Sequence, residues 1–136
     1  MQESAHGLVP APGLAARLNA QLDANSELNQ QAAQVQWSLF ENDPLLDSAN
    51  IVPENWETIA EQCRDSQAYQ GIIVIHGTDT LAYTASALAF LLQHIDIPII
   101  LTGAQKPLGV TAGDALHNLV GAMLAARRAE PGVWVY

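Results

Sequence analysis

The sequence has few basic residues, few aromatic residues and little charge of any kind. Of its 136 residues, 14% are charged and 6% aromatic, and five Lys and Arg face 14 Asp and Glu, which gives a formal net charge of -9. Five basic residues cannot form the stripe that neutralises nucleic-acid phosphates. The composition therefore excludes a nucleic-acid binder held by phosphate neutralisation, so we expect no nucleic-acid partner, and it argues against a polybasic membrane-surface module.

Long apolar runs and a second cysteine are also missing. No run approaches the ~20 residues that span a bilayer, and the first 13 residues lack the basic segment and apolar core of a signal peptide. We therefore expect no membrane partner and a cytoplasmic location. The lone Cys63 has no disulfide or zinc partner, so we expect a small buried apolar residue. His6, His94 and His117 lack metal-ligand spacing, so we expect no metal.

What the chain does contain is enough apolar sequence, 49% of residues, to bury the core of one globular domain. The apolar spacing predicts alternating strands and helices after an N-terminal loop over residues 1–12. Such alternation is typical of an α/β fold with a mainly parallel sheet and right-handed crossover helices. The expected strands cover 35–40, 71–75, 99–101 and 133–136, and the expected helices cover 13–23, 53–64, 81–92 and 114–128.

Three polar loops should meet at one edge of this sheet. They cover residues 43–50, 76–80 and 102–113, and each follows a predicted strand. Open α/β sheets bind their ligands at the carboxyl ends of parallel strands. We therefore expect the functional site where these three loops converge.

The loop at 76–80, His-Gly-Thr-Asp-Thr, carries the strongest chemical pattern. Its glycine permits close backbone approach, and Thr78 and Asp79 place a hydroxyl beside a carboxylate at the end of an apolar strand. Asp79 suits an amino group, and Thr78 suits a carboxylate or an attacking water. The alternative is a helix cap in which either side chain satisfies free amides of the next helix. The sequence leaves both roles open, and one residue can fill both.

Two further loop residues are weaker candidates. Ser48 offers a hydroxyl near a helix start, where a small carboxylate could bind, but the sequence alone favours the alternative, an Asx or Ser turn that leads into the helix at Pro53. Lys106 could be an activating cation, yet lysines in such loops are mostly solvated. Gly103 and Gly109 do not lead into a Lys-Ser or Lys-Thr pair, so a phosphate-binding loop is not supported.

Taken together, these motifs resemble the bacterial asparaginase/glutaminase family, and most of all its cytoplasmic type I L-asparaginases. The resemblance covers nearly the whole chain. It rests on DSANIVPENW at 47–56, GIIVIHGTDTLAYTASAL at 71–88 and ILTGAQKPL at 100–108, with a weaker match at Gly113-Asp114 and Asn118-Leu119. It implies hydrolysis of the side-chain amide of L-asparagine to aspartate and ammonia, no cofactor, and a homo-oligomer.

The resemblance also implies roles for individual residues. Ser48 would bind the α-carboxylate of the substrate, and Asp79 would bind its α-amino group. Thr78 would belong to the Thr-Lys-Asp group that activates a water or hydroxyl. The backbone around Ala104 would line the side-chain amide. L-Glutamine is the second candidate substrate.

Several family features are expected to lie outside these residues. Residues 1–136 would form an incomplete N-terminal asparaginase domain, without the first strand and its TGGTIG turn, the end of the domain and the C-terminal domain. Leu8 stands where the family has a loop tyrosine, and Lys106 does not align with the family's catalytic lysine. We therefore expect an inactive fragment. The alternatives are a non-catalytic amino-acid-binding or oligomerising remnant and, less favoured by the acidic charge, a tRNA-dependent amidotransferase subunit.

Overall fold

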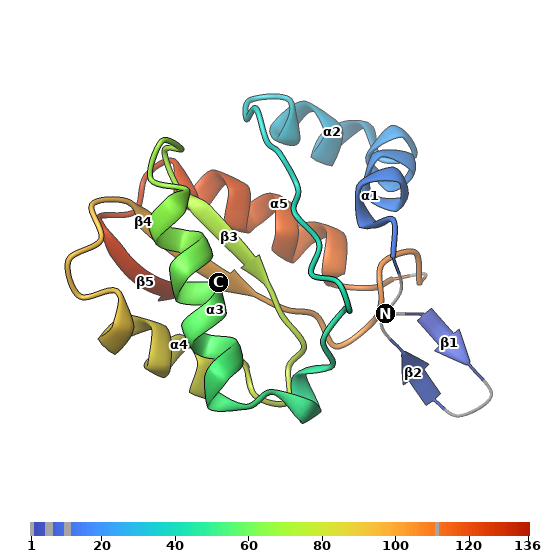
Figure 1. Cartoon of the computed structure of the whole chain (residues 1–136). Helices are drawn as coiled ribbons and strands as arrows, with labels where there is room; N and C mark the ends of the chain where they lie inside the picture. Colours follow the sequence, from blue (N-terminus) through green and yellow to red (C-terminus); the bar gives the residue numbers. More distant parts are fainter. Residues whose placement is uncertain (1, 5–6, 10–11, 111) are drawn as a thin grey trace.

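A computed structural model describes residues 2–4, 7–9, 12–110 and 112–136. Its centre is a three-stranded parallel sheet with helices on both faces (Figure 1). A two-stranded antiparallel hairpin precedes it. In chain order the elements are β1 (Gln2–Ser4), β2 (Gly7–Val9), α1 (Leu14–Asp23), α2 (Ser26–Ala32), the 3-10 helix η1 (Ser48–Asn50), α3 (Pro53–Asp65), β3 (Ile72–Ile75), α4 (Leu81–Leu91), β4 (Pro98–Thr102), α5 (Ala115–Ala126) and β5 (Gly132–Val135).

The sheet has the order β3-β4-β5, and all its strands run in the same direction. The register pairs Ile73 with Ile100 and Ile100 with Trp134. Every residue of β4 is buried, as expected for a central parallel strand covered on both faces. The carboxyl ends of β3 and β4 therefore lie side by side, and the loops that follow them leave from the same edge.

Two apolar clusters hold the helices against the sheet. Helices α3 and α4 cover one face, where residues including Ile59, Cys63 and Leu88 pack with Ile99 and Leu101. Helices α1, α2 and α5 form the other cluster, whose buried members are Leu18, Leu22, Leu28, Ala32, Leu119, Val120 and Met123. Figure 1 shows α5 behind the strands and α3 in front of them. The predicted α/β class and the parallel sheet are confirmed.

Most predicted elements are confirmed with small shifts of their ends. The helices expected at 13–23, 53–64, 81–92 and 114–128 are α1, α3, α4 and α5, and the strands expected at 71–75, 99–101 and 133–136 are β3, β4 and β5. Helix α3 begins at Pro53, as predicted. The amide of Val52 donates to Asn55 Oδ1 at 2.9 Å and completes this helix start.

The strand predicted at 35–40 is wrong. Exposure does alternate along this segment, and Val35 and Trp37 pack against the cluster around α5. No ladder forms, however, because the described part of the sheet ends at β3 and leaves this segment without a paired neighbour. The alternation of apolar and polar residues at 35–40 therefore predicted which side chains are more buried, but it did not predict the backbone hydrogen bonding.

Helix α2, the 3-10 helix η1 within the predicted loop at 43–50, and the hairpin β1-β2 were not expected. Helix α2 begins after Asn25, whose Oδ1 accepts from the amide of Leu28 at 3.1 Å. Within the region expected to be a loop, residues 2–4 and 7–9 instead pair as the hairpin β1-β2; residues 1, 5–6 and 10–11 of that predicted loop lie outside the described residues. None of the described helices has the length and hydropathy that a bilayer crossing requires.

Candidate functional site

The loop after β3 contacts the 3-10 helix η1 through Gly77, Asp79 and Thr80. Ser48 Oγ lies 3.3 Å from Asp79 Oδ2 and donates to it. Thr80 Oγ1 donates to the carbonyl of Ser48 at 2.7 Å. Ser48 is buried, with 6% of its surface exposed, whereas Thr78 and Asp79 are exposed. The sheet edge thus brings Ser48 and the 76–80 loop together, although they lie about thirty residues apart in sequence.

Gly77 is the closest point of this contact. A Cβ at position 77 would collide with Ser48 Oγ and would lie 2.8 Å from Ser48 Cβ. Only glycine lets the two backbones approach this closely. The hydrogen bond between Ser48 and Asp79 therefore depends on the missing side chain at the position between His76 and Thr78.

The loop after β4 joins the same site. A Cβ on Gly103 would lie 2.7 Å from the carbonyl oxygen of His76 and 3.4 Å from Thr78 Cγ2. The half-buried Ala104 follows directly. Three of the sequence-predicted site residues, Ser48, Thr78 and Asp79, are thus within one loop cluster, and the backbone beside Ala104 borders it.

Asp114, at the start of α5, holds the loop after β4 in place. Its carboxylate accepts from the amides of Gln105 at 2.9 Å and Lys106 at 3.0 Å. Asn118 Nδ2 donates to the carbonyl of Gly103 at 2.9 Å. These amide hydrogen bonds, Gln105 first, lower the pKa of Asp114 below its ordinary value. The carboxylate therefore acts as a clamp on residues 103–106.

The sequence reasoning missed this clamp. An aspartate at a helix start predicts a cap on the helix's own amides, but Asp114 makes no such cap hydrogen bond and reaches back to the preceding loop instead. Lys106, the candidate activating cation, donates from Nζ to the carbonyl of Ala112 at 3.3 Å within its own loop. That ammonium is therefore directed at a loop carbonyl.

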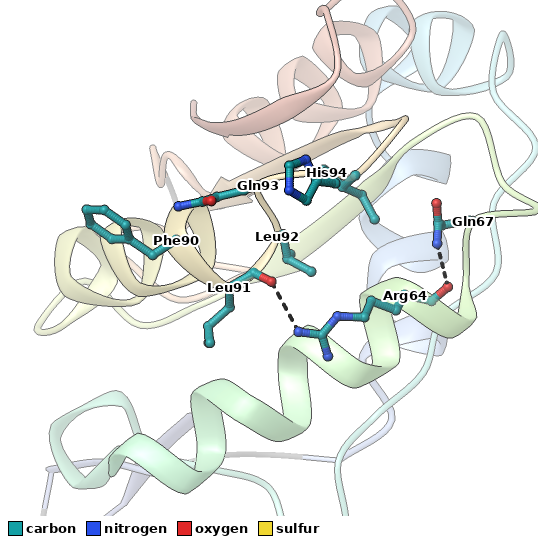
Figure 2. Close-up of a pocket in the computed structure, with 8 residues that line it drawn as sticks. Arg64, Gln67, Phe90, Leu91, Leu92, Gln93 and His94 are labelled. Atoms are coloured by element: carbon teal, nitrogen blue, oxygen red, sulfur yellow. Dashed lines mark hydrogen bonds between the residues drawn. The ribbon is translucent and has the colours of Figure 1, made fainter.

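A surface pocket of about 270 Å³ lies at the other end of α4 from this loop cluster (Figure 2). Arg64 reaches across it and donates to the carbonyl of Leu91 at 3.1 Å, while its own carbonyl accepts from Gln67 at 3.1 Å. The guanidinium is thus already used at the C-terminal end of α4, where the helix dipole disfavours an anion. The pocket lining is Arg64, Gln67, Phe90, Leu91, Leu92, Gln93, His94 and Ile95.

The described residues contain no group of three or more His, Cys, Asp or Glu that could hold a metal ion. The groups that the three loops bring to this edge are hydroxyls, a carboxylate and backbone amides and carbonyls. A hydroxyl next to a carboxylate, with backbone groups opposite, suits a small zwitterion better than a phosphate or a large apolar ligand.

The family model of the asparaginase N-terminal domain matches residues 1–136. The chain belongs to the asparaginase family. It is 39% identical over 127 residues to L-asparaginase 1 of Escherichia coli strain K12, covering 93% of this chain and 36% of that protein. The resemblance to this family is therefore confirmed.

Solved structures agree with this assignment. L-Asparaginase I of Vibrio cholerae superposes with a TM-score of 0.78 at 34% identity, covering 94% of this chain and 38% of that one. The thermostable L-asparaginase of Thermococcus kodakarensis superposes with a TM-score of 0.70 at 31% identity, covering 98% of this chain and 39% of that one. The chain of this asparaginase-family protein thus spans little more than a third of the asparaginases it matches.

Proposed function

We propose that the asparaginase-family protein represented by this chain hydrolyses L-asparagine to aspartate and ammonia, and that residues 1–136 supply its amino-acid-binding part. In this proposal Ser48 binds the α-carboxylate and Asp79 binds the α-amino group. Thr78 belongs to the group that activates a water or hydroxyl, and the backbone around Ala104 lines the side-chain amide. L-Glutamine is the second candidate substrate.

The observation that carries the proposal is the 3.3 Å distance between Ser48 Oγ and Asp79 Oδ2. The carboxylate and ammonium of an α-amino acid are attached to one carbon atom, so the groups that recognise them must also be neighbours. On binding, the Ser48 hydroxyl turns from Asp79 to donate to the α-carboxylate, and the Asp79 carboxylate accepts from the ammonium, so the pair has the correct polarity for each group. The close backbone contact at Gly77 supports a pre-organised pair.

We further propose that residues 1–136 alone do not turn over asparagine. Acyl transfer through a hydroxyl needs a neighbouring base or cation to activate the nucleophile. Among the described residues, the candidate from the sequence, Lys106, bonds to a loop carbonyl instead. Binding without turnover is therefore the expected behaviour of this chain. Its cytoplasmic location and homo-oligomeric assembly stay predictions.

Calorimetric titration with L-aspartate, the product, tests the binding site. Ser48→Ala and Asp79→Asn should each weaken binding by about 10-fold or more, because each removes a hydrogen bond to a charged group, which contributes about 1.5–3 kcal/mol. Ser86→Ala is the matched control. Its hydroxyl lies on the exposed side of α4 and donates to the carbonyl of Ala82, so its affinity should equal that of the wild type. Equal affinity in all four proteins would contradict the proposed site.

Ammonia release from L-asparagine tests the second part of the proposal. The purified 136-residue chain should release none above the rate of the buffer. Release that disappears in Thr78→Ala would show that this chain is catalytically competent, and the proposal of binding without turnover would then be wrong.

A further inference from the structure

A chain of buried and partly buried hydrogen bonds runs from α3 through α4 to the loop after β3. Trp56 Nε1 donates to Thr84 Oγ1 at 2.9 Å. Thr84 Oγ1 lies 2.9 Å from His76 Nε2, and His76 Nδ1 lies 2.7 Å from the carbonyl oxygen of Gly77. Thr84 is fully buried, and His76 is 9% exposed. None of the three side chains is among the residues assigned above to substrate binding.

The chemistry of the two end groups determines the direction of every proton in this chain. The Gly77 carbonyl can only accept, so His76 Nδ1 must carry the ring proton and donate. His76 Nε2 is then an acceptor, and the hydroxyl of Thr84 donates to it. Trp56 Nε1 can only donate, so Thr84 Oγ1 accepts from it. With a neutral ring, one arrangement alone satisfies all four groups.

The carbonyl of Gly77, at the end of this hydrogen-bond chain, is the group that connects it to the site. Gly77 lets Ser48 approach, but a glycine has the most backbone freedom of any residue. The peptide unit that joins Gly77 to Thr78 is planar, so holding the carbonyl of Gly77 also sets the direction of the Thr78 amide and the place of its Cα atom. The hydrogen bond from His76 Nδ1 to this carbonyl therefore restricts the backbone freedom that the glycine introduces.

We propose that Trp56, Thr84 and His76 form a positioning relay that locks the Gly77–Thr78 peptide, so that Thr78 faces the amino-acid site. None of the three is a catalytic residue, because each acts through its neighbour. This proposal rests on the proposed function only for the statement that Thr78 faces a bound amino acid. The hydrogen-bond chain itself makes a separate prediction, a His76 ring with its proton on Nδ1.

The ring nitrogens of His76 test the relay directly by two-bond ¹H–¹⁵N correlation in the labelled 136-residue chain. The wild type should show a pyrrole-type shift at Nδ1 and a pyridine-type shift at Nε2. Thr84→Val should alter this pattern and shift the Thr78 amide resonance, and Thr84→Ser should restore both. A proton on Nε2 in the wild type would overturn the relay.

Binding of L-aspartate shows whether the relay positions Thr78. Thr84→Val should bind roughly 5-fold more weakly than the wild type, the effect of losing one hydrogen bond, and Thr84→Ser should recover the affinity. Unchanged affinity in Thr84→Val, with its tautomer pattern altered, would overturn the positioning role. If the wild type does not bind L-aspartate, the proposed function is contradicted. The His76 tautomer and the Thr78 amide resonance would still test the relay in that case.

Three further variants keep the test decisive if Thr84→Val does not fold. Trp56→Phe removes the first donor and keeps an aromatic ring, so it should change the Thr84–His76 contact while keeping much of the packing of α3. His76→Asn places an amide donor near the position of Nδ1, and His76→Gln places its amide near the position of Nε2. The relay predicts better L-aspartate binding by His76→Asn than by His76→Gln, and the reverse order would contradict it.

Discussion

At the scale of single residues, Gly77 shows how one missing side chain builds the site. Gly77→Ala would press a methyl group against Ser48, whose Cβ would lie 2.8 Å away. Overpacking of this kind costs about 1–3 kcal/mol. We expect Gly77→Ala to lower the free energy of unfolding by that amount in urea titrations.

A double-mutant cycle identifies Ser48 as the cause. In a Ser48→Gly background the colliding atoms are gone, so Gly77→Ala should cost much less than in the wild type. An equal cost in both backgrounds would mean that the strain arises elsewhere in the 76–80 loop.

Cys63 illustrates the opposite case, a reactive group made inert by its surroundings. Burial among the side chains between α3, α4 and the sheet raises the pKa of the Cys63 thiol to about 11. Since the thiolate is the reactive form, native protein should react with a thiol-specific disulfide reagent at neutral pH at least about 10³-fold more slowly than unfolded protein. Rapid labelling of the native chain would contradict the buried position.

At the scale of elements, α5 controls the loop after β4 through Asp114. The hydrogen bonds from Gln105 and Lys106 put the pKa of Asp114 in the folded chain below its value in the unfolded chain. The stabilisation is therefore complete above the ordinary value of 3.8 and is lost as the pH falls through the lower folded value. Acid should release the loop before it unfolds the sheet.

Hydrogen exchange checks this element-level prediction. The amides of Gln105 and Lys106 should lose protection in acid in the wild type, and Asp114→Asn should lower their protection already at neutral pH. Protection at β4, for example at Ile100, serves as the internal control because it does not depend on the clamp. Unchanged protection of both loop amides in Asp114→Asn would contradict the clamp.

Most of the elements could be predicted from sequence because their signals are local. The β-branched run at 72–75 and the Pro53 helix start depend on neighbouring residues alone. Helix α2, with the polar sequence SELNQQA, has few apolar positions, and its main signal is the Asn25 cap. The strand prediction at 35–40 is wrong for a different reason. A strand requires a hydrogen-bonded partner, and a local sequence pattern does not show whether a partner is present.

The candidate site, like the fold, could be predicted from the sequence only in part. Parallel strands place Thr78 and the Ala104 loop at one edge, so their proximity follows from topology. The relay could not be predicted, because the meeting of Trp56 with Thr84 depends on how α3 and α4 pack and rotate against each other. Asp114 was visible as a helix start, but the direction of its side chain was not.

At the scale of the whole molecule, the described sheet has two open edges. Among the residues that the structure describes, β3 and β5 each pair with β4 alone. Ile75 on β3 is 43% exposed and Val135 on β5 is 58% exposed. Unpaired apolar strand edges promote association. We therefore expect the average mass in sedimentation to rise with concentration, and a stable monomer with a sharp cooperative melt would contradict this.

A matched pair of variants separates edge pairing from general apolar contact. Ile75→Lys places a charge on the β3 edge and should reduce association. Phe90→Lys places the same charge on α4, where Phe90 is 75% exposed, and should leave association unchanged. The reverse result would assign the contact to the helix surface instead of the sheet edge.

The central claim is that Ser48 and Asp79 recognise the two charged groups of one α-amino acid. Titration of the wild type and Asp79→Asn with L-aspartate and with succinate, which lacks the amino group, tests it most directly. The wild type should prefer L-aspartate by about 10-fold or more, because a charge-assisted hydrogen bond from the ammonium to a carboxylate is lost with succinate. Asp79→Asn should lose most of that preference. An equal preference in both proteins would show that Asp79 does not recognise the amino group and would contradict the proposed site.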